Sequence, residues 1–166
     1  KVRIYGSNSQ LLETVHKFQT VNQVYYPTFF YFHGLLQSIC GISKRMANRL
    51  PYTREIFPLK DGGEIGLDFL EPAQMKIKCK RDTLVLILPG VTSSSQTSYV
   101  KTLALACVSK GTSVAVMNYR GLGGVPLKTP RLYSGTNIDD LDEVITYLKI
   151  KYPAHKKIAI GTSFGG

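Results

Sequence analysis

The most constraining feature of this sequence is Gly-Thr-Ser-Phe-Gly at residues 161–165, which directly follows an apolar run at residues 157–160. A strand that runs into Gly-x-Ser-x-Gly is typical of a nucleophile elbow, a turn so tight that its serine takes a strained backbone conformation. The neighbours two residues away on each side must then have almost no side chain, and Gly161 and Gly165 meet that demand. The pattern predicts that Ser163 stands out from the end of a strand as an exposed nucleophile. The alternative is an ordinary serine in a glycine-rich turn.

Four further strands are predicted before this motif. Residues 54–60 and 64–70 are expected to form a hairpin, because Asp-Gly-Gly joins two runs rich in apolar side chains. Residues 83–88 and 113–118 are more continuously apolar, which is typical of strands covered on both faces. The motif itself follows a fifth short strand.

Two amphipathic helices are predicted between these strands. The first begins near residues 93–95 and has apolar side chains at the spacing of one buried helix face. It is expected to end at Gly111 in a left-handed cap. The second follows a loop rich in Gly and Pro at residues 119–135 and has acidic side chains in its first turns and Lys149 and Lys151 in its last, as the helix dipole favours.

This succession predicts an α/β fold with a mostly parallel sheet, flanking helices and an antiparallel hairpin that leads into it. Active sites in such sheets form at the carboxyl ends of the strands. The candidate loops are therefore residues 89–95, 119–129 and 161–166. Residues 51–166 are assigned to this domain.

Residues 1–50 are interpreted as a lead-in or cap segment, with helices over residues 9–20 and near residues 35–50. The stretch at residues 21–42 is rich in aromatic side chains but is interrupted by polar residues and Pro27, so it is a poor membrane-spanning helix. A buried or membrane-facing surface segment is expected there instead.

The net charge of +10 bears on the choice of partner. An anionic membrane surface attracts basic segments by about 1 kcal/mol per close Lys or Arg. Nucleic acid is not expected, because no nucleic-acid motif accompanies the charge. Solvated surface lysines are the third interpretation. The three widely spaced cysteines suggest neither a disulfide framework nor a metal cluster, and no cofactor is predicted.

Acyl transfer passes through a tetrahedral intermediate whose charged oxygen is usually held by two backbone N–H groups. In a nucleophile-elbow fold one comes from the residue after the serine, here Phe164, and the other from the loop after an earlier strand. Val91, just past Pro89 and Gly90, is the candidate for the second, and simple packing is its alternative role.

A serine nucleophile also needs a histidine base and a carboxylate, which follow the serine in this architecture. All three histidines precede Ser163, so neither a base nor an acid is assigned within the chain. Because the sequence begins with Lys1 and ends soon after the motif, it is interpreted as a piece of a longer protein, inactive on its own. The glycines after Arg120 do not fit a dinucleotide fingerprint, and Arg120 is expected to anchor its loop.

Several sequence segments in the same order carry a more specific resemblance. They are Phe-His-Gly-Leu-Leu-Gln-Ser at 32–38, Asp-Gly-Gly-Glu-Ile-Gly-Leu-Asp at 61–68, Leu-Pro-Gly-Val-Thr at 88–92, Asn-Tyr-Arg-Gly at 118–121, Leu-Lys-Thr-Pro-Arg-Leu-Tyr at 127–133, and the elbow. With these, residues 26–166 resemble the branch of the α/β-hydrolases that contains mammalian α/β-hydrolase domain-containing proteins 1 and 3. Phe164 stands where members more usually have methionine.

The resemblance implies a partial α/β-hydrolase fold, truncated at the elbow, and a serine hydrolase of the carboxylesterase or phospholipase type. It implies medium-length acyl esters of lipids as substrates, Ser163 as the nucleophile, and an Asp and a His beyond Gly166. It also implies a membrane-associated, intracellular protein whose anchor would precede Lys1. The alternatives are an acyltransferase to alcohols and a catalytically inactive relative that binds lipids or partners.

Overall fold

The computed structural model describes residues 9–18, 23–24, 26, 33–46, 49–79, 82–136 and 138–166. The chain divides into two compact units, Lys1–Lys44 and Arg45–Gly166. The first contains α1 (Ser9–His16) and most of α3 (Gly34–Met46), both shorter than the sequence predicts. Within the described ranges, no helix has the length and apolar character needed to cross a bilayer. Most of the aromatic residues in the predicted segment at residues 21–42 lie outside the described residues.

The second unit is built on one mixed sheet with the strand order β1-β2-β4-β3-β5. Its strands are β1 (Thr53–Pro58), β2 (Glu64–Leu70), β3 (Thr83–Leu88), β4 (Ser113–Asn118) and β5 (Lys156–Gly161). β1 pairs antiparallel with β2, and β3 pairs parallel with both β4 and β5. The hairpin and the parallel strands are therefore confirmed. The sequence did not indicate that β2 would pair antiparallel with β4.

The hairpin closes through a turn that needs glycine. Gly62 has φ 83°, in the left-handed region that side chains disfavour. Its N–H donates to the carbonyl oxygen of Leu59 at 3.0 Å, and the Leu59 N–H donates to the carbonyl oxygen of Gly63 at 2.9 Å. These two bonds place β2 beside β1.

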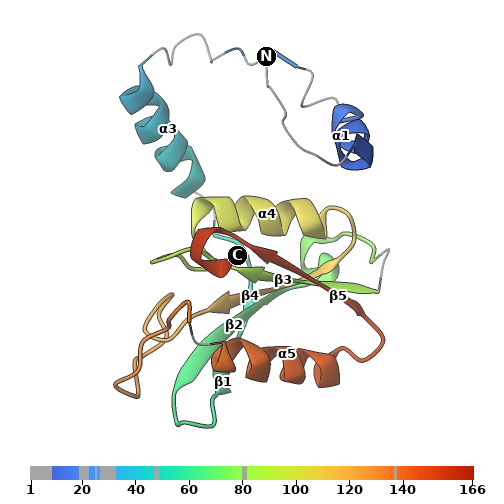
Figure 1. Cartoon of the computed structure of the whole chain (residues 1–166). Coiled ribbons are helices and arrows are strands. Elements are labelled where there is room, and N and C mark those ends of the chain that lie inside the picture. The colour runs from blue at the N-terminus through green and yellow to red at the C-terminus, as the bar shows by residue number, and fades with distance from the viewer. Residues whose placement is uncertain are drawn as a thin grey trace. The chain divides into compact units, whose positions relative to one another are not determined.

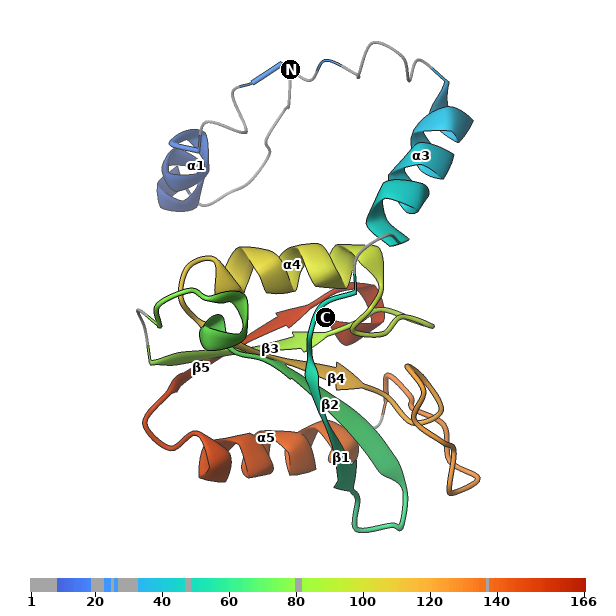
Figure 2. The ribbon, with the colours of Figure 1, turned by 180° about the vertical axis from the view of Figure 1, so that it is seen from behind.

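Helices cover both faces of the sheet: α4 (Ser98–Val108) lies on one face and α5 (Asp139–Lys151) on the other (Figures 1 and 2). The predicted start of the first helix near residues 93–95 is wrong, because residues 89–97 form turns. The Ser93 N–H donates to Gly90, and the Thr97 N–H donates to Ser94, at 3.1 and 3.0 Å. Gly111 has the predicted left-handed backbone, with φ 76°, but the predicted cap position is wrong, because the cap residue of α4 is Ser109.

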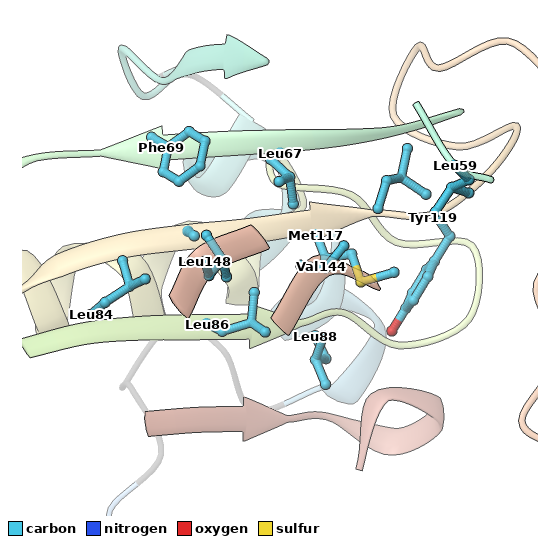
Figure 3. Close-up of a cluster of buried hydrophobic side chains, with 12 residues drawn as sticks. Leu59, Leu67, Phe69, Leu84, Leu86, Leu88, Met117, Tyr119, Val144 and Leu148 are labelled. Carbon is cyan, nitrogen blue, oxygen red and sulfur yellow. The ribbon is translucent and has the colours of Figure 1, made fainter. Parts of the chain in front are cut away.

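Alternate side chains of the central strands enter two separate cores. Leu86 and Met117 pack with Leu148 of α5 in the cluster shown in Figure 3. On the opposite face, Ile87 and Val116 belong to the cluster of α4. This double burial confirms the prediction made from the apolar runs. The parallel pairing of β3 with β4 and β5 places the carboxyl ends of these three strands at one edge of the sheet.

Candidate active site

The chain turns sharply where β5 ends. Ser163 has φ 56° and begins the short 3-10 helix η2 (Ser163–Gly165). A residue with a Cβ in this left-handed region costs roughly 1–2 kcal/mol. The Thr162 N–H donates to the carbonyl oxygen of Leu88 at 3.1 Å, and the Gly165 N–H donates to the carbonyl oxygen of Thr162 at 3.1 Å. Strand and backbone bonds thus hold the serine in the strained conformation that the motif predicts.

Both motif glycines are required by close backbone approach. A Cβ at Gly161 would lie 2.5 Å from the Cα of Gly166, and a Cβ at Gly165 would lie 2.7 Å from the carbonyl carbon of Leu88. Real Cβ atoms essentially never come that close to backbone atoms. The turn can therefore form only where these two positions lack side chains.

The loop after β3 lies against the elbow. A Cβ at Gly90 would come within 3.2 Å of the Thr162 carbonyl oxygen and 3.4 Å of the Ser163 Cβ. The structure thus brings the segment that contains Val91 beside the predicted nucleophile. The cause is the parallel pairing of β3 with β5, in which Leu88 is opposite Gly161.

Backbone N–H groups of this loop are mostly occupied. The Gly90 N–H donates to the Tyr99 hydroxyl at 2.7 Å, and the Thr92 N–H donates to the Tyr133 hydroxyl at 3.3 Å. The Ser93 N–H donates to Gly90, as described above. Across the described part of the chain, no acceptor is found for the N–H of Val91.

The loop's far end is anchored in a buried polar cluster that the sequence did not indicate. The Ser95 N–H donates to Asn118 Oδ1 at 2.8 Å, and the Ser95 hydroxyl donates to the buried Asp68. Arg54 donates from Nε and one Nη to both Asp68 oxygens at 2.7 Å. Burial raises the pKa of Asp68, but the hydrogen bonds from Arg54, Ser95 and Asn118 outweigh it and hold that pKa below its usual value.

At the elbow, the N–H of Phe164 likewise has no acceptor among the described residues. The predicted donor groups of Val91 and Phe164 are both open for a hydrogen bond to a ligand. Their assignment to an oxyanion stays a prediction.

The Phe164 ring meets two tyrosines edge to face. Its centroid lies 5.2 Å from that of Tyr133 and 6.2 Å from that of Tyr119, at interplanar angles of 87° and 86°. The two tyrosine rings stack at 4.9 Å. Together these rings line part of a cavity of about 140 Å³ beside the elbow. Sequence reasoning did not single out Tyr119 or Tyr133, whose contacts join segments far apart in the chain.

The loop after β4 is held by Arg120, whose side chain is 2% exposed. Its Nε and one Nη donate to both oxygens of Asp140 at 2.6 and 2.7 Å, and its other Nη contacts Asp61 at 2.7 Å. The expected anchoring role of Arg120 is confirmed. Asp140, predicted only to complement the helix dipole, is also the buried partner of this arginine. The hydrogen bond from Arg120, with a second from the Gly63 N–H, lowers the pKa of Asp61 to about 2.

Comparisons with known proteins agree with this geometry. No family model matches the chain. Protein abhd-3.2 of Caenorhabditis elegans is 35% identical over 162 residues, which cover 95% of this chain and 42% of that protein. Phospholipase ABHD3 of Homo sapiens is 32% identical over 148 residues, which cover 88% of this chain and 36% of that protein. The chain therefore spans about two fifths of the length of these relatives.

Among solved structures, an alpha-beta serine hydrolase homologue from Coxiella burnetii superposes with a TM-score of 0.58 at 19% identity. The match covers 72% of this chain and 55% of the other. At this identity the likeness shows the fold alone, and it confirms the fold that the strand order and the elbow predict.

Proposed function

Since the chain belongs to the α/β-hydrolase superfamily and resembles the branch that contains phospholipase ABHD3, we propose that the full-length protein is a serine hydrolase of lipid acyl esters. The supporting observation is Ser163 at φ 56°, in a turn beside the loop after β3; the N–H groups of Phe164 and Val91 in these two segments have no acceptor among the described residues. A merely structural serine needs neither the strained turn nor the open donors. Phospholipase and lipase relatives support a lipid ester as substrate class.

In the proposed reaction the Ser163 Oγ attacks the ester carbonyl carbon and gives its proton to a histidine base. The carbonyl oxygen becomes an oxyanion and accepts hydrogen bonds from the N–H groups of Val91 and Phe164. Collapse of the intermediate breaks the bond to the alcohol, which takes the proton and leaves an acyl-enzyme on Ser163. Water then attacks that ester and releases the acid. We place the histidine and its orienting carboxylate after Gly166, where the chain order of this fold puts them.

Two finer features belong to the same proposal. We propose acyl chains of medium length, in keeping with the resemblance to the branch. We also propose that the protein works at an intracellular membrane, which the net charge of +10 would favour if the surface carries anionic lipid.

A fluorophosphonate probe tests the central claim, because only an activated serine reacts with it quickly. We expect rapid labelling of the full-length protein and complete loss of labelling in Ser163→Ala. Ser109→Ala is the matched control, since Ser109 caps α4 with its hydroxyl on the Ala106 carbonyl and should label as the parent does.

Two outcomes separate the alternatives. A folded parent protein that does not label would be a binding relative without esterase chemistry. A protein that labels, but transfers its acyl group to added alcohol in preference to water, would be an acyltransferase. For the hydrolase proposal, free fatty acid must be the main product from phospholipid vesicles.

A further inference from the structure

Three tyrosine hydroxyls from three different segments bind the backbone of residues 89–92. Tyr99, in the first turn of α4, accepts the Gly90 N–H at 2.7 Å. Tyr119, just after β4, donates to the carbonyl oxygen of Pro89 at 3.1 Å. Tyr133, in the loop that follows, accepts the Thr92 N–H at 3.3 Å. Residues 89–92 themselves belong to no helix or strand.

These bonds surround one peptide group. The N–H groups of residues 90 and 92 are both fixed on phenol oxygens, and the N–H of Val91 lies between them in the chain. Peptide groups are planar, so fixing the two neighbours strongly limits the rotation of the middle one. Thr92 also has φ 56°, a sparsely populated conformation that persists only where surrounding contacts hold it. The direction of the Val91 N–H therefore depends on the tyrosines.

The same tyrosines contact the elbow. Phe164 presents its ring edge to face against Tyr133 and Tyr119, and those two rings stack on each other. The residue that offers one open N–H thus packs against the side chains that orient the other. A shift of the Tyr133 ring would therefore move the N–H groups of both Val91 and Phe164. Loss of the Tyr133 hydroxyl alone would release only the loop that contains Val91.

We propose that Tyr133, with Tyr99 and Tyr119, is a positioning residue that presets the Val91 N–H for the oxyanion. This inference rests on the proposed function and deepens it. Preorganised donors stabilise a developing charge far better than donors that must reorient during the reaction. Burial raises the pKa of Tyr119 to about 12, so its hydroxyl stays a donor throughout the pH range of an esterase assay.

The test uses Tyr133→Phe and Tyr99→Phe in the full-length protein, each of which removes one oxygen and keeps the ring. Tyr147→Phe is the matched control, because the Tyr147 hydroxyl on α5 bonds to Glu55. We expect kcat to fall about tenfold or more in the first two variants, somewhat less than the 10²–10³ lost with a whole oxyanion donor. KM should change little, since the ester ground state does not need the preset donor.

A second readout separates positioning from general loosening. An acyl trifluoromethyl ketone forms a tetrahedral oxyanion with the serine, whereas the matching methyl ketone does so weakly. Affinity for the trifluoromethyl ketone should fall by the same factor as kcat/KM, and competitive inhibition by the methyl ketone should stay unchanged. Tyr147→Phe should alter none of these values.

Unchanged kcat in both Tyr133→Phe and Tyr99→Phe would overturn the positioning role and leave the proposed function intact. Equal loss of affinity for both ketones would also overturn it, because the tyrosines would then only shape the pocket. If the parent protein fails to label with fluorophosphonate, the proposed function fails and this inference falls with it. Should Tyr133→Phe not fold, Tyr99→Phe alone decides between these results.

Discussion

The carbonyl group of Leu88, at the end of β3, lies so close to Gly165 that its carbon would be 2.7 Å from any Cβ at that position. The oxygen of the same carbonyl group accepts the Thr162 N–H at 3.1 Å. One backbone group therefore fixes the approach of the two loops that carry the candidate donors. The relationship follows from the parallel register that sets Leu88 opposite Gly161. Because of this close approach, position 165 must be glycine, and a substitution there can test the requirement.

Gly165→Ala should disrupt this approach. The new methyl group would meet backbone atoms that cannot rotate away, so we expect a loss of about 1–3 kcal/mol in the free energy of unfolding. Fluorophosphonate labelling of the folded fraction should fall as well, since Ser163 must move with the turn. Gly41→Ala is the control, because nothing lies within 4 Å of a Cβ there. Chemical denaturation and labelling rates measure the two effects, and parent-like values for both would contradict the close approach.

Arg120→Met should be strongly destabilising. It leaves Asp140 partly buried without the two hydrogen bonds that it accepts at 2.6 and 2.7 Å. Removing one partner of a buried ion pair typically costs about 3–5 kcal/mol. Arg120→Lys should recover only part of this, because an ammonium cannot make the forked contact. Arg131→Met is the matched control: its contacts are longer and its side chain is 33% exposed, so urea melts should shift by under about 1 kcal/mol.

The contrast between Asp140 and Gly111 shows what the sequence could reveal. The left-handed backbone of Gly111 is predicted correctly, because the turn after a helix is decided by neighbouring residues. Asp140 looked like any acidic residue of a first helical turn, and its pairing with Arg120 depends on a contact across 20 positions. The start of α4 was misplaced for a similar reason, since tyrosine hydroxyls and Asn118 compete for the loop's N–H groups. Hydrophobic periodicity and the serine motif predict the strands and the elbow. The sequence does not reveal which side chain pairs with Arg120 or which side chains bind the loop after β3, because the fold brings these residues together from distant positions.

Acid should destabilise the protein partly through Asp61. Its pKa is lowered to about 2 in the folded state, chiefly by the hydrogen bond from Arg120, whereas an aspartate in an unfolded chain has a pKa of about 3.9. A depressed folded pKa gives stability that is fully present above about pH 4 and is lost as the pH falls towards 2. Between these values Asp61→Asn should therefore lose stability less steeply than the parent, in melts at closely spaced pH. A slope for Asp61→Asn equal to that of the parent would contradict the pairing with Arg120.

Asp68→Asn should separate stability from catalysis. The Asp68 carboxylate accepts hydrogen bonds from Arg54, Ser95 and Asn118, and its own pKa is held low by them. An amide cannot accept at both atoms, so one donor loses its partner, at a cost of about 1–3 kcal/mol for a buried group. The cluster anchors the loop at Ser95, beyond the three tyrosine bonds that fix residues 89–92. Labelling per folded molecule should therefore stay close to that of the parent while the urea midpoint falls. If labelling falls as steeply as in Tyr133→Phe, the Asp68 cluster at Ser95 would also control the direction of the Val91 N–H. The inference that only the tyrosines do so would then be wrong.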